Sequence, residues 1–210
     1  MSVNKVWIIG LPRTATTSVC VASLGLGLKT AHTAYTQDSI KDSQVVADTP
    51  IFADYQALDK LYPNSKFVNL VRNTESWVPS IRQLLLRMFD NLQRDDGGFN
   101  PYLKRCYNQV FAPLTIDNIH DDSFLIDCYN RHQKHIAHYF IGRNQDLLTI
   151  DIKDKDSFDM YCAFLDVIPP HDHPGFERIN IGGKVTAWNK IKHPLKIAST
   201  RNGRIDSALY

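Results

Sequence analysis

The sequence has few cysteines and no long hydrophobic run. Its four cysteines are widely spaced and include no C-x-x-C pair, which argues against both a disulfide framework and a zinc site. The apolar run at residues 6–9 ends at Gly10 and is too short for a secretory signal or a membrane span. We therefore expect a cytoplasmic protein that has reduced, mostly buried thiols and does not enter a membrane.

A strong net charge is also missing, since 24 Lys and Arg residues oppose 22 Asp and Glu residues and leave +2. Nucleic-acid-binding proteins are usually more basic throughout, so no nucleic-acid partner is expected. The charge is uneven, however, because residues 178–210 hold seven Lys or Arg and one Asp, a charge of +6 against −4 for the rest. This basic C-terminal segment is expected to be either a solvated tail or a strip that attracts an anionic cofactor or acceptor.

With 210 residues, 43% of them hydrophobic, the chain is long enough for one globular domain with a sizeable core. Helical patterns alternate with short apolar runs, which is typical of a parallel sheet covered by helices on both faces. The runs expected to form strands are residues 5–9, 28–32, 44–47, 66–71 and 147–152. We predict a single α/β domain over residues 1–210, with a three-layer α/β/α architecture, a central, mainly parallel sheet and a helical region at about residues 81–142.

Residues 10–18, Gly-Leu-Pro-Arg-Thr-Ala-Thr-Thr-Ser, lie between the first strand and an apolar stretch, which indicates a strand, a tight loop and a helix start. Backbone N–H groups at a helix N-terminus bind anions, and hydroxyls add donors. A nucleotide P-loop reads G-x-x-x-x-G-K-[ST], but here Ala15 replaces the second glycine and Thr16 the lysine. The loop therefore predicts a phosphate or phosphosulfate site whose cation is an arginine. The residues expected to contact this anion are Arg13, Thr14, Ala15, Thr16, Thr17 and Ser18.

A second anion site is predicted where the strand at residues 66–71 ends in Arg72. Pro79 has no N–H and belongs in a first helical turn, so the helix should begin near Ser76, with Ser80 close to its N-terminal end. Arg72, the helix-start amides and the Ser80 hydroxyl would then converge on one phosphate. An arginine at a strand end can instead form a structural ion pair, but two such sites fall where open α/β sheets bind ligands.

In this order and spacing the two motifs resemble those of the sulfotransferases that use 3′-phosphoadenosine 5′-phosphosulfate (PAPS). The loop is similar to the G-x-P-R-S-G-T-T loop of bacterial members, and a Ser eight residues after an Arg is similar to the family's 3′-phosphate site. The resemblance implies a fold like that of P-loop NTPases and a sulfuryl transfer that leaves 3′-phosphoadenosine 5′-phosphate (PAP), with no metal required. It implies that Arg13 holds the 5′-phosphosulfate, and that Arg72 and Ser80 hold the 3′-phosphate. A looser similarity at residues 178–184 implies that Arg178 also contacts the donor.

Two residues are candidates for the base that deprotonates the acceptor. Asp48, in the turn Asp-Thr-Pro, takes the position of the histidine in the His-x-Pro turn of cytosolic members. A carboxylate with an ordinary pKa near ~3.9 is a weak base unless its surroundings raise that pKa. His32, at the end of the second strand, has an ordinary pKa closer to neutral pH. We favour Asp48; a turn residue or a strand-end histidine can also be purely structural.

The resemblance implies a small-molecule or carbohydrate acceptor bound on the side of the helical region, and it predicts no oligomeric state. Two other functions also fit the loop. A small-metabolite kinase of the P-loop class would use the same strand, loop and helix, with Arg13 in the role of the lysine. A non-catalytic module that binds nucleotides or other anions would need the loop alone.

Overall fold

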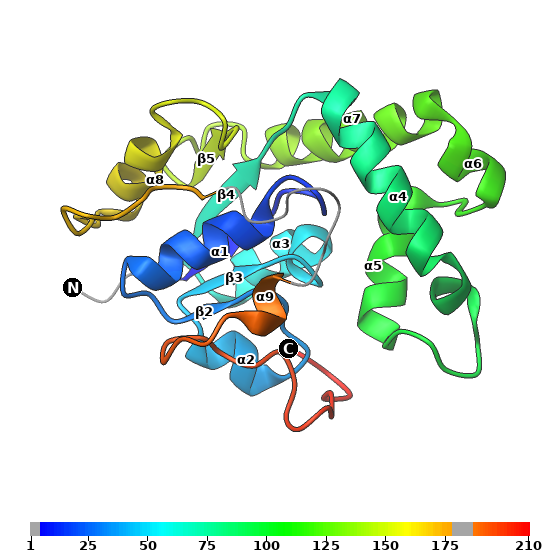
Figure 1. Ribbon diagram of the computed structural model, residues 1–210, viewed down its shortest axis with the longest axis horizontal. Helices are drawn as coiled ribbons and strands as arrows, with labels where there is room; N and C mark the ends of the chain where they lie inside the picture. Colours follow the sequence, from blue (N-terminus) through cyan, green and yellow to red (C-terminus); the bar gives the residue numbers. More distant parts are fainter. Residues whose placement is uncertain (1–4, 178–186) are drawn as a thin grey trace.

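A five-stranded sheet forms the centre of the computed structural model, which describes residues 5–177 and 187–210 (Figure 1). Its paired strands are parallel and follow the order β2-β3-β1-β4-β5. The strands are β1 (Val6–Ile8), β2 (Thr30–Ala31), β3 (Val45–Ala47), β4 (Lys66–Leu70) and β5 (Leu147–Ile150). Each of the five predicted strands is confirmed, although each is shorter than its apolar run.

Helices occupy most of the chain between and after the strands. They are α1 (Thr16–Gly25), α2 (Gln37–Asp42), α3 (Ile51–Leu61), α4 (Thr74–Gln93), α5 (Pro101–Phe111), α6 (Ile116–His120), α7 (Asp122–Tyr139), α8 (Ser157–Leu165) and α9 (Ala187–Lys190). Within residues 5–177 and 187–210, no helix has the length and apolar character needed to cross a bilayer. The four cysteines are buried and free, as predicted.

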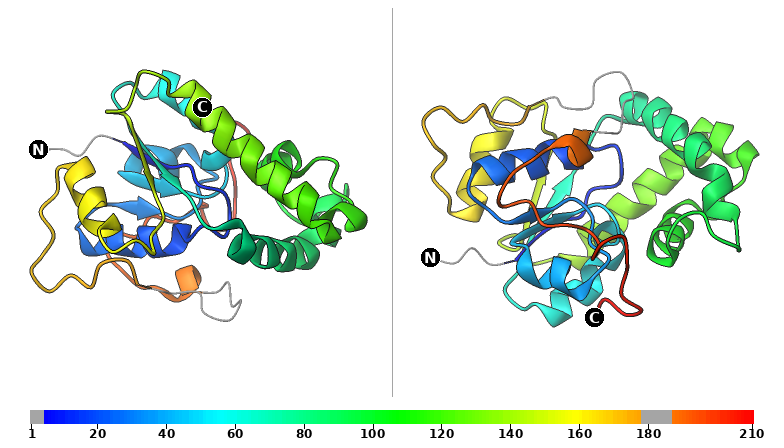
Figure 2. Two further views of the ribbon diagram at one scale, coloured as in Figure 1. Left: turned by 90° about the horizontal axis from the view of Figure 1, so that it is seen from above. Right: turned by 60° about the horizontal axis from the view of Figure 1, so that its bottom comes forward.

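The sheet is buried on both faces. Side chains alternate along a strand, so neighbouring residues of β1 face opposite sides. Val6 and Ile8 pack in a core with residues of α1 and α8, whereas Trp7 packs in another core with residues of α3 and α7. Figure 2 shows α1 and α8 on one side of the sheet and α3 and α7 on the other. The predicted three-layer α/β/α architecture is therefore confirmed.

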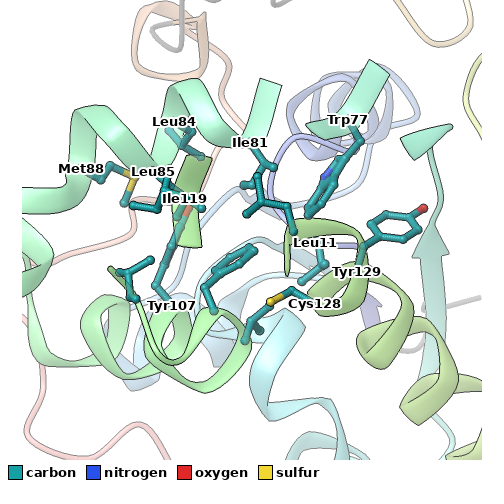
Figure 3. Close-up of a cluster of buried hydrophobic side chains, with 14 of the residues drawn as sticks. Leu11, Trp77, Ile81, Leu84, Leu85, Met88, Tyr107, Ile119, Cys128 and Tyr129 are labelled. Carbon is teal, nitrogen blue, oxygen red and sulfur yellow. The ribbon is translucent and has the colours of Figure 1, made fainter. Parts of the chain in front are cut away.

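A helical lobe made of α4, α5, α6 and the first part of α7 lies to one side of the sheet (Figure 1). The lobe has its own hydrophobic core, in which Trp77, Leu85 and Ile119 are fully buried (Figure 3). Leu11 from the loop after β1 also belongs to this core. The lobe corresponds to the helical region predicted at about residues 81–142, and it packs directly against the loop that the sequence identifies as an anion site.

Helix α4 begins at Thr74, two residues earlier than the position of Pro79 had predicted. The cause is Asn73, whose side chain caps the helix by accepting a hydrogen bond from the backbone N–H of Glu75 at 2.8 Å. Pro79 is consequently the sixth helical residue and lies beyond the first turn. The predicted start near Ser76 is wrong because the Asn73 cap determines where the helix begins. A proline after the first turn makes a helix less favourable, but it does not set the first residue.

The described part of the basic C-terminal segment, residues 187–210, packs on the body of the protein. Thr30 of β2 donates its N–H to Leu195 O at 3.0 Å and accepts from Ile197 N at 2.9 Å, so the segment pairs with the edge of the sheet. Farther along, Leu209 is buried in the core that includes α3. The interpretation as a solvated tail is therefore wrong for these residues, because backbone pairing and apolar burial hold them.

Candidate active site

The loop between β1 and α1 packs closely against the end of β4. A Cβ at Gly10 would lie 2.6 Å from Leu70 Cβ and 2.8 Å from Leu70 O, so only glycine fits there. Two later residues have left-handed backbone, with φ of 72° at Arg13 and 77° at Ala15. Ala15 is the N-cap of α1 and its side chain caps no backbone N–H. After this sharp turn α1 begins, and the side chain of its N-cap residue does not bond to the first backbone amides of the helix.

The carbonyl oxygens of residues 11–13 each accept a hydrogen bond, one from within the loop and two from residues at the end of β4 and in α4. The Thr14 hydroxyl donates to Leu11 O at 2.7 Å, the Trp77 indole N–H donates to Pro12 O at 3.0 Å, and the Arg72 guanidinium donates to Arg13 O at 2.9 Å. An anion site must keep carbonyl oxygens away from the anion and leave amides facing it. These three bonds hold the loop carbonyls in that arrangement.

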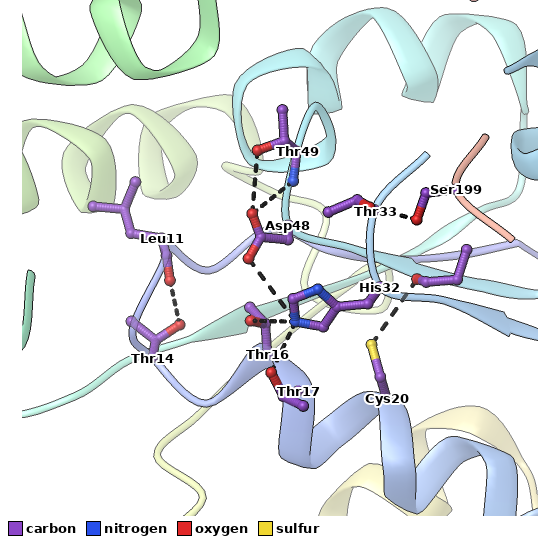
Figure 4. A network of polar contacts seen from close by, with 11 residues as sticks. Leu11, Thr14, Thr16, Thr17, Cys20, His32, Thr33, Asp48, Thr49 and Ser199 are labelled. Carbon is purple, nitrogen blue, oxygen red and sulfur yellow. Dashed lines mark hydrogen bonds and ion pairs between the residues drawn. The ribbon is translucent and has the colours of Figure 1, made fainter. Parts of the chain in front are cut away.

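His32 and Asp48 meet beside the start of α1 (Figure 4). His32 follows β2, and its Nε2 lies 2.9 Å from Thr17 Oγ1 and 3.2 Å from Thr16 Oγ1. Asp48 follows β3, and its Oδ2 lies 3.9 Å from the same His32 nitrogen. The two candidate bases therefore belong to one network with the loop hydroxyls, because the carboxyl ends of β1, β2 and β3 share one edge of the sheet.

The orientation of Asp48 is fixed by the residue that follows it. The backbone N–H and the hydroxyl of Thr49 both donate to Asp48 Oδ1, at 2.8 and 3.2 Å. Asp48 itself has left-handed backbone with φ of 56°, a conformation that short polar side chains tolerate better than most. With Oδ1 held by Thr49, Oδ2 is the oxygen directed toward His32 and the loop.

Burial controls the charge of the histidine in this network. It lowers the pKa of His32 below its ordinary value, the carboxylate of Asp48 acts in the opposite direction, and the Lys196 ammonium lowers the pKa further. Burial also lowers the pKa of Arg13, as do the neighbouring cations Arg87 and Arg72, but a guanidinium stays charged at neutral pH. At pH 7 the site therefore contains a neutral imidazole between a carboxylate and a cationic loop.

Arg72 and the loop cation lie next to each other at the ends of β4 and β1. Arg72 donates through Nε to Ser76 Oγ at 3.1 Å, while Arg13 donates through Nε to Ser80 Oγ at 2.8 Å. Arg72 and Ser80, which were predicted to act together, therefore lie in the same part of the site. They do not bond to each other, because Arg72 bonds to Ser76 and to the backbone of Arg13, and Ser80 bonds to the Arg13 side chain. The sequence analysis uses Ser76 only to place the helix start. Its position four residues after Arg72, in the first turn of α4, is the sequence signal for its contact with that arginine.

A cavity of about 260 Å³ lies between the strand ends and the helical lobe. Arg13, His32 and Asp48 line it at the strand ends. The opposite wall is formed by Leu84 and Met88 of α4 and by Leu103 and Tyr107 of α5, whereas Trp188 of α9 packs against His32 beside the strand ends. The sequence predicts the first group and the helical region that supplies the opposite wall, but not Trp188. Arg178, the remaining predicted donor contact, lies outside the described residues.

A parallel sheet whose first strand leads through an anion-binding loop into a helix defines the P-loop-like class of α/β proteins. A family model described as "Sulfotransferase domain" matches residues 33–185, which is more than half of the chain. The protein therefore belongs to the sulfotransferase family, enzymes that generally use PAPS as the sulfuryl donor. No curated protein matches the sequence. The resemblance drawn from the two motifs is confirmed, and the matched region includes Asp48, Arg72 and Ser80 but begins just after His32.

Proposed function

We propose that this protein transfers the sulfuryl group of PAPS to a hydroxyl or amine of an acceptor bound in the cavity. The observation that carries the proposal is the contact between the two arginines, in which Arg72 donates to the backbone oxygen of Arg13 at 2.9 Å. Two cationic groups at the ends of adjacent parallel strands match a donor with phosphate groups at both ends of its ribose.

The loop is suited to the phosphosulfate end of PAPS. We assign the backbone amides and hydroxyls at residues 14–18, together with Arg13, to the 5′-phosphosulfate. Negative charge gathers on the 5′-phosphate as the bond between sulfur and the bridging oxygen breaks, and preorganised donors stabilise that charge. Arg72 and Ser80 are assigned to the 3′-phosphate, the group that distinguishes PAPS from ATP.

Asp48 is the base that we favour. Its Oδ2 would accept the proton of the acceptor hydroxyl as the acceptor oxygen bonds to sulfur. Thr49 keeps Oδ1 occupied, so the carboxylate presents one oxygen in a fixed direction. His32 is the alternative base, but its Nε2 already lies within hydrogen-bond distance of Thr16 and Thr17, which favours a role in orienting those hydroxyls.

Binding of PAP tests the proposal most directly. PAP should raise the Tm of the full chain without Mg²⁺, since a ligand that binds the folded state stabilises it. Arg72→Ala should weaken PAP binding about tenfold or more, because a charge-assisted hydrogen bond is lost, and should barely change binding of adenosine 5′-monophosphate. Titration calorimetry with both nucleotides measures the two effects.

The matched control is Arg94→Ala, which removes an exposed arginine that follows the end of α4 and pairs with Asp96. This variant should bind PAP as the unchanged protein does. Equal losses for both nucleotides in Arg72→Ala would contradict the assignment of the 3′-phosphate. Stabilisation by Mg-ATP in place of PAP would instead support the small-metabolite kinase, and stabilisation by neither would leave only a binding module.

A further inference from the structure

Two aromatic residues of the helical lobe reach the strand-end edge of the sheet through their polar atoms. Trp77 of α4 and Tyr129 of α7 belong to the lobe core, where their ring centroids lie 4.8 Å apart (Figure 3). Both residues are buried. Closely packed rings keep one rotamer, because the alternatives would collide with their neighbours. A backbone group that bonds to either residue is therefore held in a fixed place.

The indole of Trp77 bonds to the loop that carries Arg13. Its N–H donates to Pro12 O at 3.0 Å, and Pro12 is buried. The peptide bond between Pro12 and Arg13 is trans, so the carbonyl of Pro12 and the N–H of Arg13 point in opposite directions. By holding the carbonyl toward α4, Trp77 turns the Arg13 N–H away from α4. It thereby sets the orientation of the peptide unit from which the Arg13 side chain extends.

The hydroxyl of Tyr129 bonds to the backbone of the other arginine. It accepts a hydrogen bond from the Arg72 N–H at 2.9 Å, just beyond the end of β4. Burial raises the pKa of Tyr129, so this hydroxyl is neutral at pH 7. The Arg72 side chain in turn donates to Arg13 O at 2.9 Å. The contacts therefore form a closed ring that runs from Trp77 through the loop and Arg72 to Tyr129 and back.

Loss of either bond would leave a backbone group without its partner. A buried Pro12 O without a donor is costly, so the peptide unit would rotate toward other partners for part of the time. The apparent affinity for a ligand falls in proportion to the fraction of molecules that hold the binding arrangement. A fivefold loss of affinity thus corresponds to a loop that holds this arrangement about one fifth of the time.

We propose that Trp77 and Tyr129 are positioning residues of the donor site and that each controls a different end of the donor. Trp77 holds the loop for the 5′-phosphosulfate, and Tyr129 holds Arg72 for the 3′-phosphate. The inference rests on the proposed function. Neither side chain lines the cavity at the strand ends, so both act through the backbone that carries the two arginines.

Titration calorimetry of the full chain with PAP and with adenosine 5′-monophosphate tests the inference, at a temperature well below the Tm of each variant. Phenylalanine keeps an aromatic ring at either position and removes the atom that forms the hydrogen bond. Trp77→Phe should weaken binding of both nucleotides at least fivefold, because both place a 5′-phosphate in the loop. Tyr129→Phe should weaken PAP at least fivefold and adenosine 5′-monophosphate less than twofold, because only PAP carries a 3′-phosphate.

Two matched controls make the same substitutions away from the donor site. Trp7→Phe alters another fully buried indole, whose N–H has no hydrogen-bond partner among the described residues. Tyr139→Phe removes a hydroxyl from the same helix, α7, where it donates to Asp59 at 2.7 Å. Whatever their effect on Tm, both controls should bind PAP and adenosine 5′-monophosphate within twofold of the unchanged protein.

Binding of PAP by the unchanged protein separates the inference from the proposed function. If PAP binds, but Trp77→Phe and Tyr129→Phe lower only the Tm, the two residues serve packing alone; the inference is then wrong and the proposed function stands. Equal losses for both nucleotides in Tyr129→Phe also overturn the inference. If Trp77→Phe does not fold, the two affinities of Tyr129→Phe decide. If the unchanged protein does not bind PAP, the proposed function fails and the inference fails with it.

Discussion

The strand-end edge of the sheet and the helical lobe are held together by opposite kinds of contact. At the edge, polar side chains bond to one another across long stretches of sequence, as in the bond from Arg13 to Ser80. In the lobe, fully buried apolar residues such as Leu85 and Ile119 pack together. The edge carries the groups that we assign to chemistry, and the lobe carries apolar packing. Substitutions in the two regions should therefore separate activity from stability.

The largest effect is expected at the edge, from Asp48→Asn. Asparagine can still accept the hydrogen bonds of Thr49, but it cannot take a proton, so kcat should fall about 100-fold to 10,000-fold with little change in Tm. Steady-state kinetics and thermal unfolding measure the two quantities. Asp38→Asn, on the exposed surface of α2, is the control and should leave kcat unchanged. A normal kcat in Asp48→Asn, with a loss in His32→Asn, would transfer the role of base to His32.

In the lobe, Leu85→Ala should cost about 2–5 kcal/mol of unfolding free energy, because it leaves a cavity in a closely packed core. The folded fraction should keep its kcat/KM. Leu86, the next residue, is 38% exposed, and Leu86→Ala should cost far less. Urea unfolding of the Leu85→Ala and Leu86→Ala variants measures the two losses of unfolding free energy. Equal costs at both positions, or a lost kcat/KM in folded Leu85→Ala, would contradict the division between the two regions.

His132 of α7 lies between the two regions, and its Nε2 lies 2.9 Å from Ile9 O. Burial lowers the pKa of His132 to about 4 from an ordinary value of 6.5. The unfolded chain, in which His132 has its ordinary pKa, binds a proton on this side chain more readily than the folded protein does. The free energy of unfolding is therefore highest above pH 6.5 and decreases as the pH falls toward 4. Between pH 7.5 and pH 5 the loss should be about 2 kcal/mol by urea unfolding. In His132→Gln the free energy of unfolding should depend much less on pH over this range. An unchanged pH dependence would show that other groups cause it.

The smallest effect is expected at the loop, from Ala15→Gly. Ala15 has a left-handed backbone with φ of 77°, a conformation that costs an alanine on the order of 1 kcal/mol relative to glycine. Glycine removes this cost but also gives the unfolded chain more conformational freedom, which offsets part of the stabilisation. We expect a net stabilisation of about 0.5 kcal/mol. Ala163→Gly, inside α8, should instead destabilise by about 1 kcal/mol. Destabilisation at both positions would contradict the loop geometry.

The sheet could be predicted because continuous apolar runs are what strands buried on both faces require, and β1 and β4 follow such runs closely. The loop could be predicted because its pattern is local in sequence. The contribution of Trp188 to the cavity could not be predicted, because Trp188 lies far from the loop along the chain and no local sequence pattern links the two. The assignment of Asp48, Arg72 and Ser80 to specific roles stays a prediction.

The course of the C-terminal segment was equally hard to predict, because its many Lys and Arg residues suggest exposure to solvent. What holds it is backbone pairing with Thr30 and the burial of Leu209, neither of which has a signature in charge or composition. The start of α4 was misplaced for a related reason: two local signals, Asn73 and Pro79, competed, and the cap decided the outcome.

The pairing of residues 195–197 with Thr30 has a consequence for self-association. β2 is a two-residue strand at the border of the sheet, and an open border offers free N–H and C=O groups to a strand from another molecule. Leu195 and Ile197 already occupy the backbone groups of Thr30. Intermolecular strand addition at this border would first require the segment to detach, which guards the protein against edge-to-edge aggregation.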